Sequence, residues 1–149
     1  MNQAHFHLLV NHLPIAGVIF GFLILLAGYL FHSQVIKRTA LGLFLAATLL
    51  AVPTFLTGEG AEEVIEDLPG ISHDMIEEHE EAGKTYLILL FVLSAAAIAT
   101  LVTEAKNLKI NRSLYLLTVV LSVGCIAVAA QAGVSGGEIR HTEIRQQPT

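Results

Sequence analysis

The chain has 149 residues, of which 54% are apolar and 14% are charged, and it contains no tryptophan. This composition is too apolar for an ordinary soluble domain of this size, so we expect a membrane protein. The formal net charge is −5, and nothing in the composition indicates binding to nucleic acid. The single cysteine, Cys125, excludes a disulfide framework, a cysteine-ligated iron–sulfur cluster and covalent haem attachment within one chain.

Four segments are long enough and apolar enough to cross a bilayer as helices. We expect these spans at residues 8–31, 39–58, 79–103 and 113–137. A backbone in lipid must satisfy its own hydrogen bonds, which favours helices over open strands. The sequence therefore predicts an all-α fold, a single integral membrane domain over residues 1–149 built as a bundle of four transmembrane helices. The first span is expected to remain as a helix because no basic region precedes it.

Two short connections between the spans are basic. They hold five of the eight basic residues, namely Lys37, Arg38, Lys106, Lys109 and Arg112. By the positive-inside rule these connections face the cytoplasm, which predicts that both termini and the long middle segment lie outside.

The middle segment, residues 59–84, carries ten acidic residues and one basic residue. Helical spacing of apolar residues before Pro69 predicts a short amphipathic helix on the membrane surface, formed around Ala61, Val64, Ile65 and Leu68. Ser72 is the predicted N-cap of a second helix that runs on into the third span. The acidic surface is a predicted docking site for a basic redox partner protein.

The histidines are unevenly distributed in this topology. Six of the seven fall at the predicted outer end, and only His32 falls at the other. The outer six are His5, His7, His12, His73, His79 and His141. Because imidazole ligates several metals and haem iron, this gathering indicates a metal or a metal cofactor.

Two histidines are the best ligand candidates from their local sequence. At 100° per residue, His79 shares a helix face with apolar residues and lies opposite the neighbouring carboxylates, so it points toward the bundle. Gly83, one turn further, leaves room for a flat group. His12 lies beside Pro14. This proline either occupies the first turn of a helix and leaves residues 5–12 as a non-helical entry, or it frees the Val10 carbonyl and kinks the helix just inside His12.

Two other features concern packing. Gly17, Gly21 and Gly28 form a stripe that predicts close approach of another helix. Gln131 is costly in lipid, so we expect it to face the interior or a bound group.

The order of these motifs resembles the DUF2231 family of uncharacterised bacterial membrane proteins. The resemblance covers nearly the whole chain and rests on His7-x4-His12-x-Pro14-Ile15-Ala16, Thr57-Gly58, His79 and Gly136-Gly137-x3-His141. The chain departs from the family at Leu8, where a proline is usual, and at Asn11. The resemblance implies that His7, His12, His79 and His141 are the family-like histidines. Some members look joined to cytochrome-type domains, which implies haem or redox work.

We therefore expect a membrane b-type haem protein that transfers electrons, rather than an enzyme, with haem b near the outer, periplasmic face of the bacterial inner (cytoplasmic) membrane. The predicted axial ligands are His12 and His79, and a second site would use His7 and His141. Basic side chains at this end are predicted to pair with the haem propionates, namely Lys84, Arg140 and Arg145.

Two other classes stay open. In one, three or four histidines bind or transport a zinc, copper or iron ion. In the other, the chain is a structural subunit of a membrane complex. A homodimer is also left open, and the lipid bilayer is the expected surroundings in every case.

Overall fold

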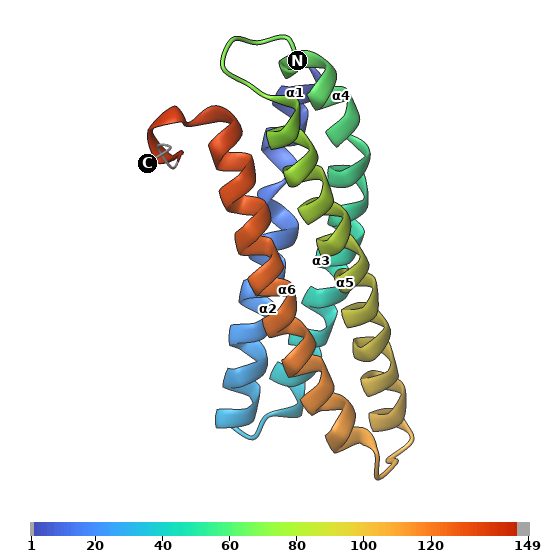
Figure 1. Ribbon diagram of the computed structural model, residues 1–149. Helices are drawn as coiled ribbons and strands as arrows, with labels where there is room; N and C mark the ends of the chain where they lie inside the picture. Colours follow the sequence, from blue (N-terminus) through green and yellow to red (C-terminus); the bar gives the residue numbers. More distant parts are fainter. Residues whose placement is uncertain (1, 146–149) are drawn as a thin grey trace.

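The computed structural model describes residues 2–145, and this part of the chain is helical with no strand, which confirms the predicted all-α class (Figure 1). The elements are α1 (Gln3–Val10), α2 (His12–Leu30), α3 (Gln34–Leu56), α4 (Gly58–Ile65), α5 (His73–Ala105), α6 (Asn111–Arg140) and the 3₁₀ helix η1 (Thr142–Ile144).

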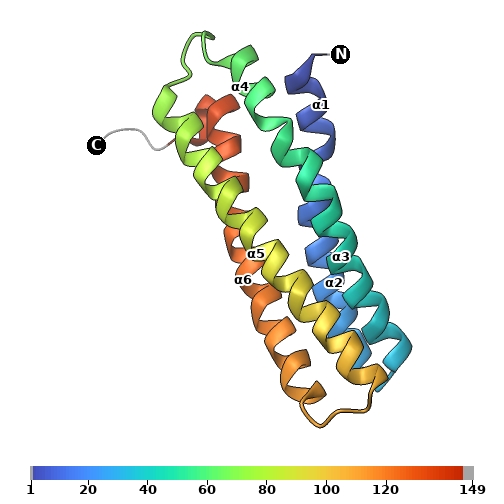
Figure 2. The same cartoon turned by 90° about the vertical axis from the view of Figure 1, so that its right-hand side faces the viewer.

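The helices α2, α3, α5 and α6 run alternately up and down as a bundle (Figures 1 and 2). Each packs against its neighbour in the chain, and contacts between α2 and α6 close the ring. Four helical segments in the described residues are long and apolar enough to cross a membrane, as predicted. Because α1, α4, the start of α5 and the end of α6 lie together, we name this the histidine end. The opposite end, with residues 31–33 and 106–110, is the basic-loop end.

Two tight turns join the helices at the basic-loop end. His32 and Asn107 adopt left-handed backbone angles, with φ of 53° and 51°. The Ser33 N–H donates to the Gly28 carbonyl at 3.0 Å, and the Leu108 N–H donates to the Thr103 carbonyl at 2.9 Å. This is the hydrogen bonding of a Schellman cap. His32 therefore has a structural role in ending α2, which accounts for the one histidine at this end.

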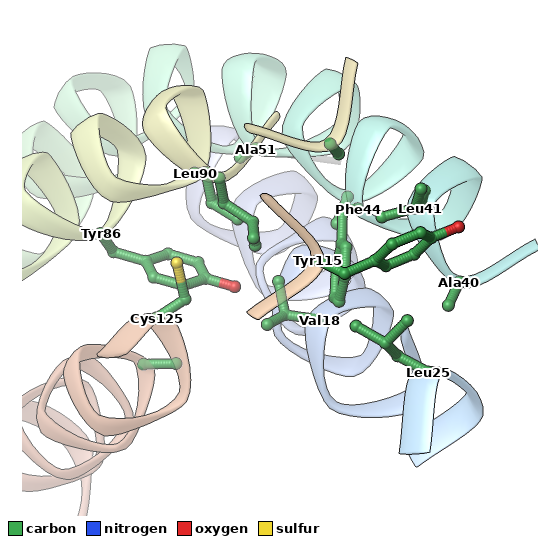
Figure 3. Packing of buried hydrophobic residues seen from close by; sticks show 14 residues of the cluster. Val18, Leu25, Ala40, Leu41, Phe44, Ala51, Tyr86, Leu90, Tyr115 and Cys125 are labelled. Atoms are coloured by element: carbon green, nitrogen blue, oxygen red, sulfur yellow. The ribbon is translucent and has the colours of Figure 1, made fainter. Parts of the chain in front are cut away.

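The glycine stripe of α2 packs directly against α3, as predicted. A Cβ on Gly17 would lie 2.9 Å from the Ala47 Cβ, and one on Gly21 would lie 2.6 Å from the Phe44 ring. Only glycine permits this separation of the two helices, and Phe44 is fully buried in the core beside it (Figure 3).

The entry to the first span contains a break. Asn11 separates α1 from α2, and Pro14 lies in the first turn of α2. The residues before Pro14 are themselves helical, so a non-helical entry does not form. The missing N–H of Pro14 frees the Val10 carbonyl, as the second alternative expected.

The acidic segment begins with α4, which follows α3 after a break at Thr57 and packs against α1. Ala61 is buried, whereas Val64 and Leu68 are exposed. The position of this segment on a membrane surface stays a prediction. Ser72 is the N-cap of α5, and α5 runs without interruption into the third span, both as predicted.

Candidate cofactor site

His7 projects from α1 toward the end of α3. Its Nδ1 lies 3.1 Å from the Thr54 carbonyl oxygen and 3.1 Å from the Thr57 hydroxyl. A carbonyl can only accept, and the Thr57 hydroxyl donates to the same carbonyl at 2.9 Å. His7 therefore carries its proton on Nδ1, which leaves the lone pair on Nε2.

His79 projects from α5 toward α6, as its position on the helix predicts. Its Nδ1 lies 3.2 Å from the Ser135 hydroxyl, which itself donates to the Ala132 carbonyl at 3.3 Å. The Ser135 oxygen is thus the acceptor and His79 Nδ1 the donor. The ring lies on Gly136, where a Cβ would approach its Cε1 to 2.8 Å. Gly136 is therefore needed for this position of the imidazole.

The two rings share one end of the bundle and are both partly buried. Each has Nδ1 held by a partner on a neighbouring helix, and within the described residues neither Nε2 makes a hydrogen bond. Two imidazoles are thus oriented with their metal-binding nitrogens free.

The structure does not bring His12 to this pair. His12 is exposed on the outside of the bundle, whereas Pro14, two residues later, is buried. Two residues correspond to 200° around a helix, so a buried Pro14 directs His12 outward. His12 is therefore not placed with His79, and the histidines that hydrogen bonds hold at this end of the bundle are His7 and His79.

His141 also lies outside the pair. It follows the last residue of α6, its ring is exposed, and its Nδ1 lies 3.0 Å from the Glu143 carboxylate. Hydrogen bonds from its own backbone N–H and from His141 keep the pKa of Glu143 below its usual value, so the carboxylate stays charged. His5 and His73 are exposed as well. Of the six histidines at this end, only His7 and His79 are partly buried.

The remaining predicted residues lie around the pair. Gly83 has open space where a Cβ would stand. Lys84 is exposed and pairs with Glu80 at 3.0 Å, and Arg140 is exposed. Gln131 faces outward rather than inward, because it lies 200° around α6 from the buried Ala129. It lines an open groove of about 300 Å³ with Glu78 and Ser135.

Two buried polar atoms that were not predicted as functional lie at the break between α1 and α2 and in α5. Within the described residues, the Asn11 Oδ1 and the Tyr86 hydroxyl are buried without a hydrogen-bond partner. Tyr86 follows His79 by seven residues and so shares its helix face. That spacing was the available signal for Tyr86.

In the described part of the chain, no group of three or more histidine, cysteine or carboxylate side chains is placed to hold a metal ion. Comparison with protein-family models, with curated proteins and with solved structures finds no match. The proposals below therefore depend on the residues and their geometry.

Proposed function

We propose that the chain is a membrane b-type haem protein that transfers electrons, with His7 and His79 as the iron ligands. The supporting observation is the hydrogen bonding of the two imidazoles. Histidines that ligate metals commonly donate Nδ1–H to a carbonyl or another acceptor, which fixes the ring and presents Nε2. His7 of α1 and His79 of α5 both have this arrangement.

The number of donors favours haem over a bare ion. Haem iron is held by axial ligands from the protein, and its porphyrin supplies the other four. A protein zinc site needs three or four side chains. His7 and His79 fit the first requirement. When bound, haem supplies a one-electron iron couple.

The chain's own residues would orient and shield the group. The Thr54 carbonyl and Thr57 hydroxyl fix the His7 ring, and Ser135 fixes the His79 ring. Gly136 lets the His79 ring lie against the backbone of α6, and the open space at Gly83 is one turn away on the helix that carries His79. Lys84 and Arg140 are the cations at this end proposed to meet the propionates.

The membrane arrangement extends this proposal. The basic-loop end would face the cytoplasm, which places the histidine pair near the outer face of a bacterial inner membrane. The exposed carboxylates of residues 59–81 would then face outward and attract a basic electron carrier. We also propose that the chain is related to the DUF2231 family, because His7 and His79 are two of the four histidines that carry the resemblance.

The test is an absorption spectrum of protein purified in detergent and titrated with haemin. We expect a Soret band that shifts on reduction with dithionite, and we expect His7→Ala and His79→Ala to lose it. His12→Ala is the matched control, because His12 is exposed, and it should keep the band.

Elemental analysis of the same sample decides the alternatives. Colourless protein with stoichiometric zinc or copper would replace the haem proposal with an ion site, and colourless, metal-free protein that takes up no haemin would overturn both.

A further inference from the structure

The basic-loop end carries positive charge that the chain itself does not neutralise. The five basic residues at and beside the two turns face a single carboxylate, that of Glu104. Glu104 pairs with Arg38 at 2.9 Å. Within the described residues no carboxylate pairs with the other four, which are Lys37, Lys106, Lys109 and Arg112. This end of the bundle is therefore suited to an anion from outside the chain.

One of these four cations, Lys37 at the start of α3, is held in place by aromatic rings. Its ammonium lies 5.2 Å from the centroid of the Tyr29 ring and 5.1 Å from that of the Tyr115 ring. The rings belong to α2 and α6 and meet edge to face, with their centroids 6.0 Å apart. Both distances are within the range of a cation–π contact. The charge of Lys37 is thus fixed beside α2 and α6, and no carboxylate neutralises it.

The backbone of α2 accommodates the stem of Lys37. A Cβ on Gly28 would lie 2.6 Å from the Lys37 Cγ and 2.9 Å from its backbone nitrogen, so the stem lies where only glycine leaves room. Lysines near the ends of spans commonly extend their ammonium into water. The Lys37 ammonium instead stays over two rings, one of which, Tyr115, is buried. Extension into solvent therefore does not account for its position.

Arg112 adds a second positive charge on the neighbouring helix. It precedes Tyr115 by three residues, so the two side chains lie one turn apart on the same side of α6. Arg112 is exposed, and within the described residues neither it nor the Lys37 ammonium donates a side-chain hydrogen bond. A guanidinium can bind phosphate through two parallel hydrogen bonds, and an ammonium binds it as a compact charge. The two side chains thus offer free donors of the kinds that bind a phosphate group.

Apolar side chains continue from these cations along α2. Ile19, Leu26 and Leu30 follow one another at spacings of seven and four residues, on the side of α2 next to Tyr29, and all three are exposed. An exposed apolar surface of this kind favours contact with hydrocarbon. A free phosphate would meet the cations alone, whereas an anion with acyl chains would meet both surfaces.

We propose that the basic-loop end binds an anionic phospholipid, with its phosphate between Lys37 and Arg112 and its acyl chains along α2. Basic pockets between membrane helices on the cytoplasmic side are known to bind anionic headgroups, and the basic-loop end is the one expected to face the cytoplasm. The inference goes beyond the proposed haem function. It depends on the membrane location of the chain and not on the histidine pair.

Native mass spectrometry of the full chain in detergent measures lipid binding directly. Phosphatidylglycerol is the anionic probe, and phosphatidylcholine with the same acyl chains is the zwitterionic one. We expect phosphatidylglycerol to bind and phosphatidylcholine at the same concentration not to displace it. Lys37→Met removes the ammonium and keeps most of the stem, and Arg112→Gln removes the guanidinium. Each should weaken binding about fivefold, the contribution of one basic residue near anionic lipid, and both together about 25-fold.

Matched controls separate a site from a general effect of charge. Lys84→Met makes the same change at the histidine end and should bind as the wild type. Arg38→Met/Glu104→Gln removes an ion pair at the basic-loop end without changing its net charge, and it should also bind as the wild type. Circular dichroism establishes that each variant is folded, and Arg112→Gln, at an exposed residue, provides the test if Lys37→Met does not fold.

Several results would overturn the proposal. Equal binding of phosphatidylcholine would show that the cations do not select the headgroup. Displacement of phosphatidylglycerol by inorganic phosphate at the lipid's concentration would show a site for a soluble anion. Folded Lys37→Met and Arg112→Gln proteins that bind as the wild type, or an equal loss in Lys84→Met, would remove the site. His79→Ala should leave lipid binding unchanged, so this proposal and the haem proposal can fail separately.

Discussion

The Thr54 hydroxyl of α3 lies 3.3 Å from the Val10 carbonyl, the group that Pro14 leaves without a helical partner. The backbone carbonyl of the same threonine accepts from His7. The same hydroxyl lies 2.9 Å from the Leu50 carbonyl of its own helix, so its one proton is shared between the two carbonyls. One residue of α3 thus contacts both the break in the first span and the imidazole one turn before it. The position of His7 is therefore coupled to the break at Asn11.

Thr54→Val removes the hydroxyl and keeps the carbonyl. We expect a loss of about 1 kcal/mol in stability, since one hydrogen bond to a partly buried carbonyl is lost. Unfolding in mixed detergent micelles, followed by circular dichroism, measures it. Thr39→Val is the control, because the Thr39 hydroxyl bonds only to Val35 of its own helix. Equal stability of the two variants would contradict the role assigned to Thr54.

Ser135→Ala removes the acceptor that holds the His79 ring. Loss of an outer-shell partner typically lowers metal affinity 10- to 100-fold, so we expect weaker haemin binding by about that factor without its abolition. Titration of the purified variant with haemin measures the affinity. Thr142→Ala changes an exposed hydroxyl beyond α6 and should bind as the wild type. Unaltered binding by Ser135→Ala would show that this hydroxyl does not orient the ligand.

Gly17→Val tests the contact of α2 with α3. The added side chain meets the Ala47 Cβ and backbone, so we expect a destabilisation of about 1–3 kcal/mol from overpacking. Gly42→Val is the matched control, because a Cβ there meets nothing within 4 Å. Thermal unfolding in detergent compares them. A Gly17 variant as stable as the Gly42 variant would mean that the helices separate at little cost.

Arg38→Met leaves the Glu104 carboxylate buried without its cation. We expect a loss of about 3 kcal/mol, because an uncompensated buried charge costs more than the exposed arginine gains from the pair. The double variant Arg38→Met/Glu104→Gln should recover part of this, since it removes the charge as well. A double-mutant cycle in detergent gives the coupling. Additive effects of the two changes would contradict an ion pair of this strength.

The sequence predicted most of the fold because composition and helical period determine it. The uncharged segments, the Ser72 cap and the glycine stripe all depend on residues close together in the chain, and the structure confirms each. The histidine end also followed from topology alone. In contrast, the partner of the carbonyl that Pro14 frees lies on a helix more than forty residues away, which no local pattern contains.

The candidate site was predicted only in part. His79 was placed correctly because the apolar and acidic faces of α5 differ so clearly. The sequence favoured His12 over His7 as a ligand, whereas the structure exposes His12 and partly buries His7, which hydrogen-bonds to α3. The break at Asn11 separates the helices that carry the two histidines. Gln131 was predicted to face the interior because a polar side chain is costly in lipid, but it is exposed on the outside of the bundle.

His32 lies in the turn that ends α2, at the opposite end of the bundle from all the other histidines. Chemical labelling of histidines can therefore report which end of the chain faces which side of a membrane. An impermeant reagent that modifies imidazoles, added to one face of sealed vesicles, would reach either His32 alone or the exposed histidines of the other end, His5, His12, His73 and His141. Mass spectrometry of the modified peptides then gives the fraction of molecules inserted in each direction, without any engineered label.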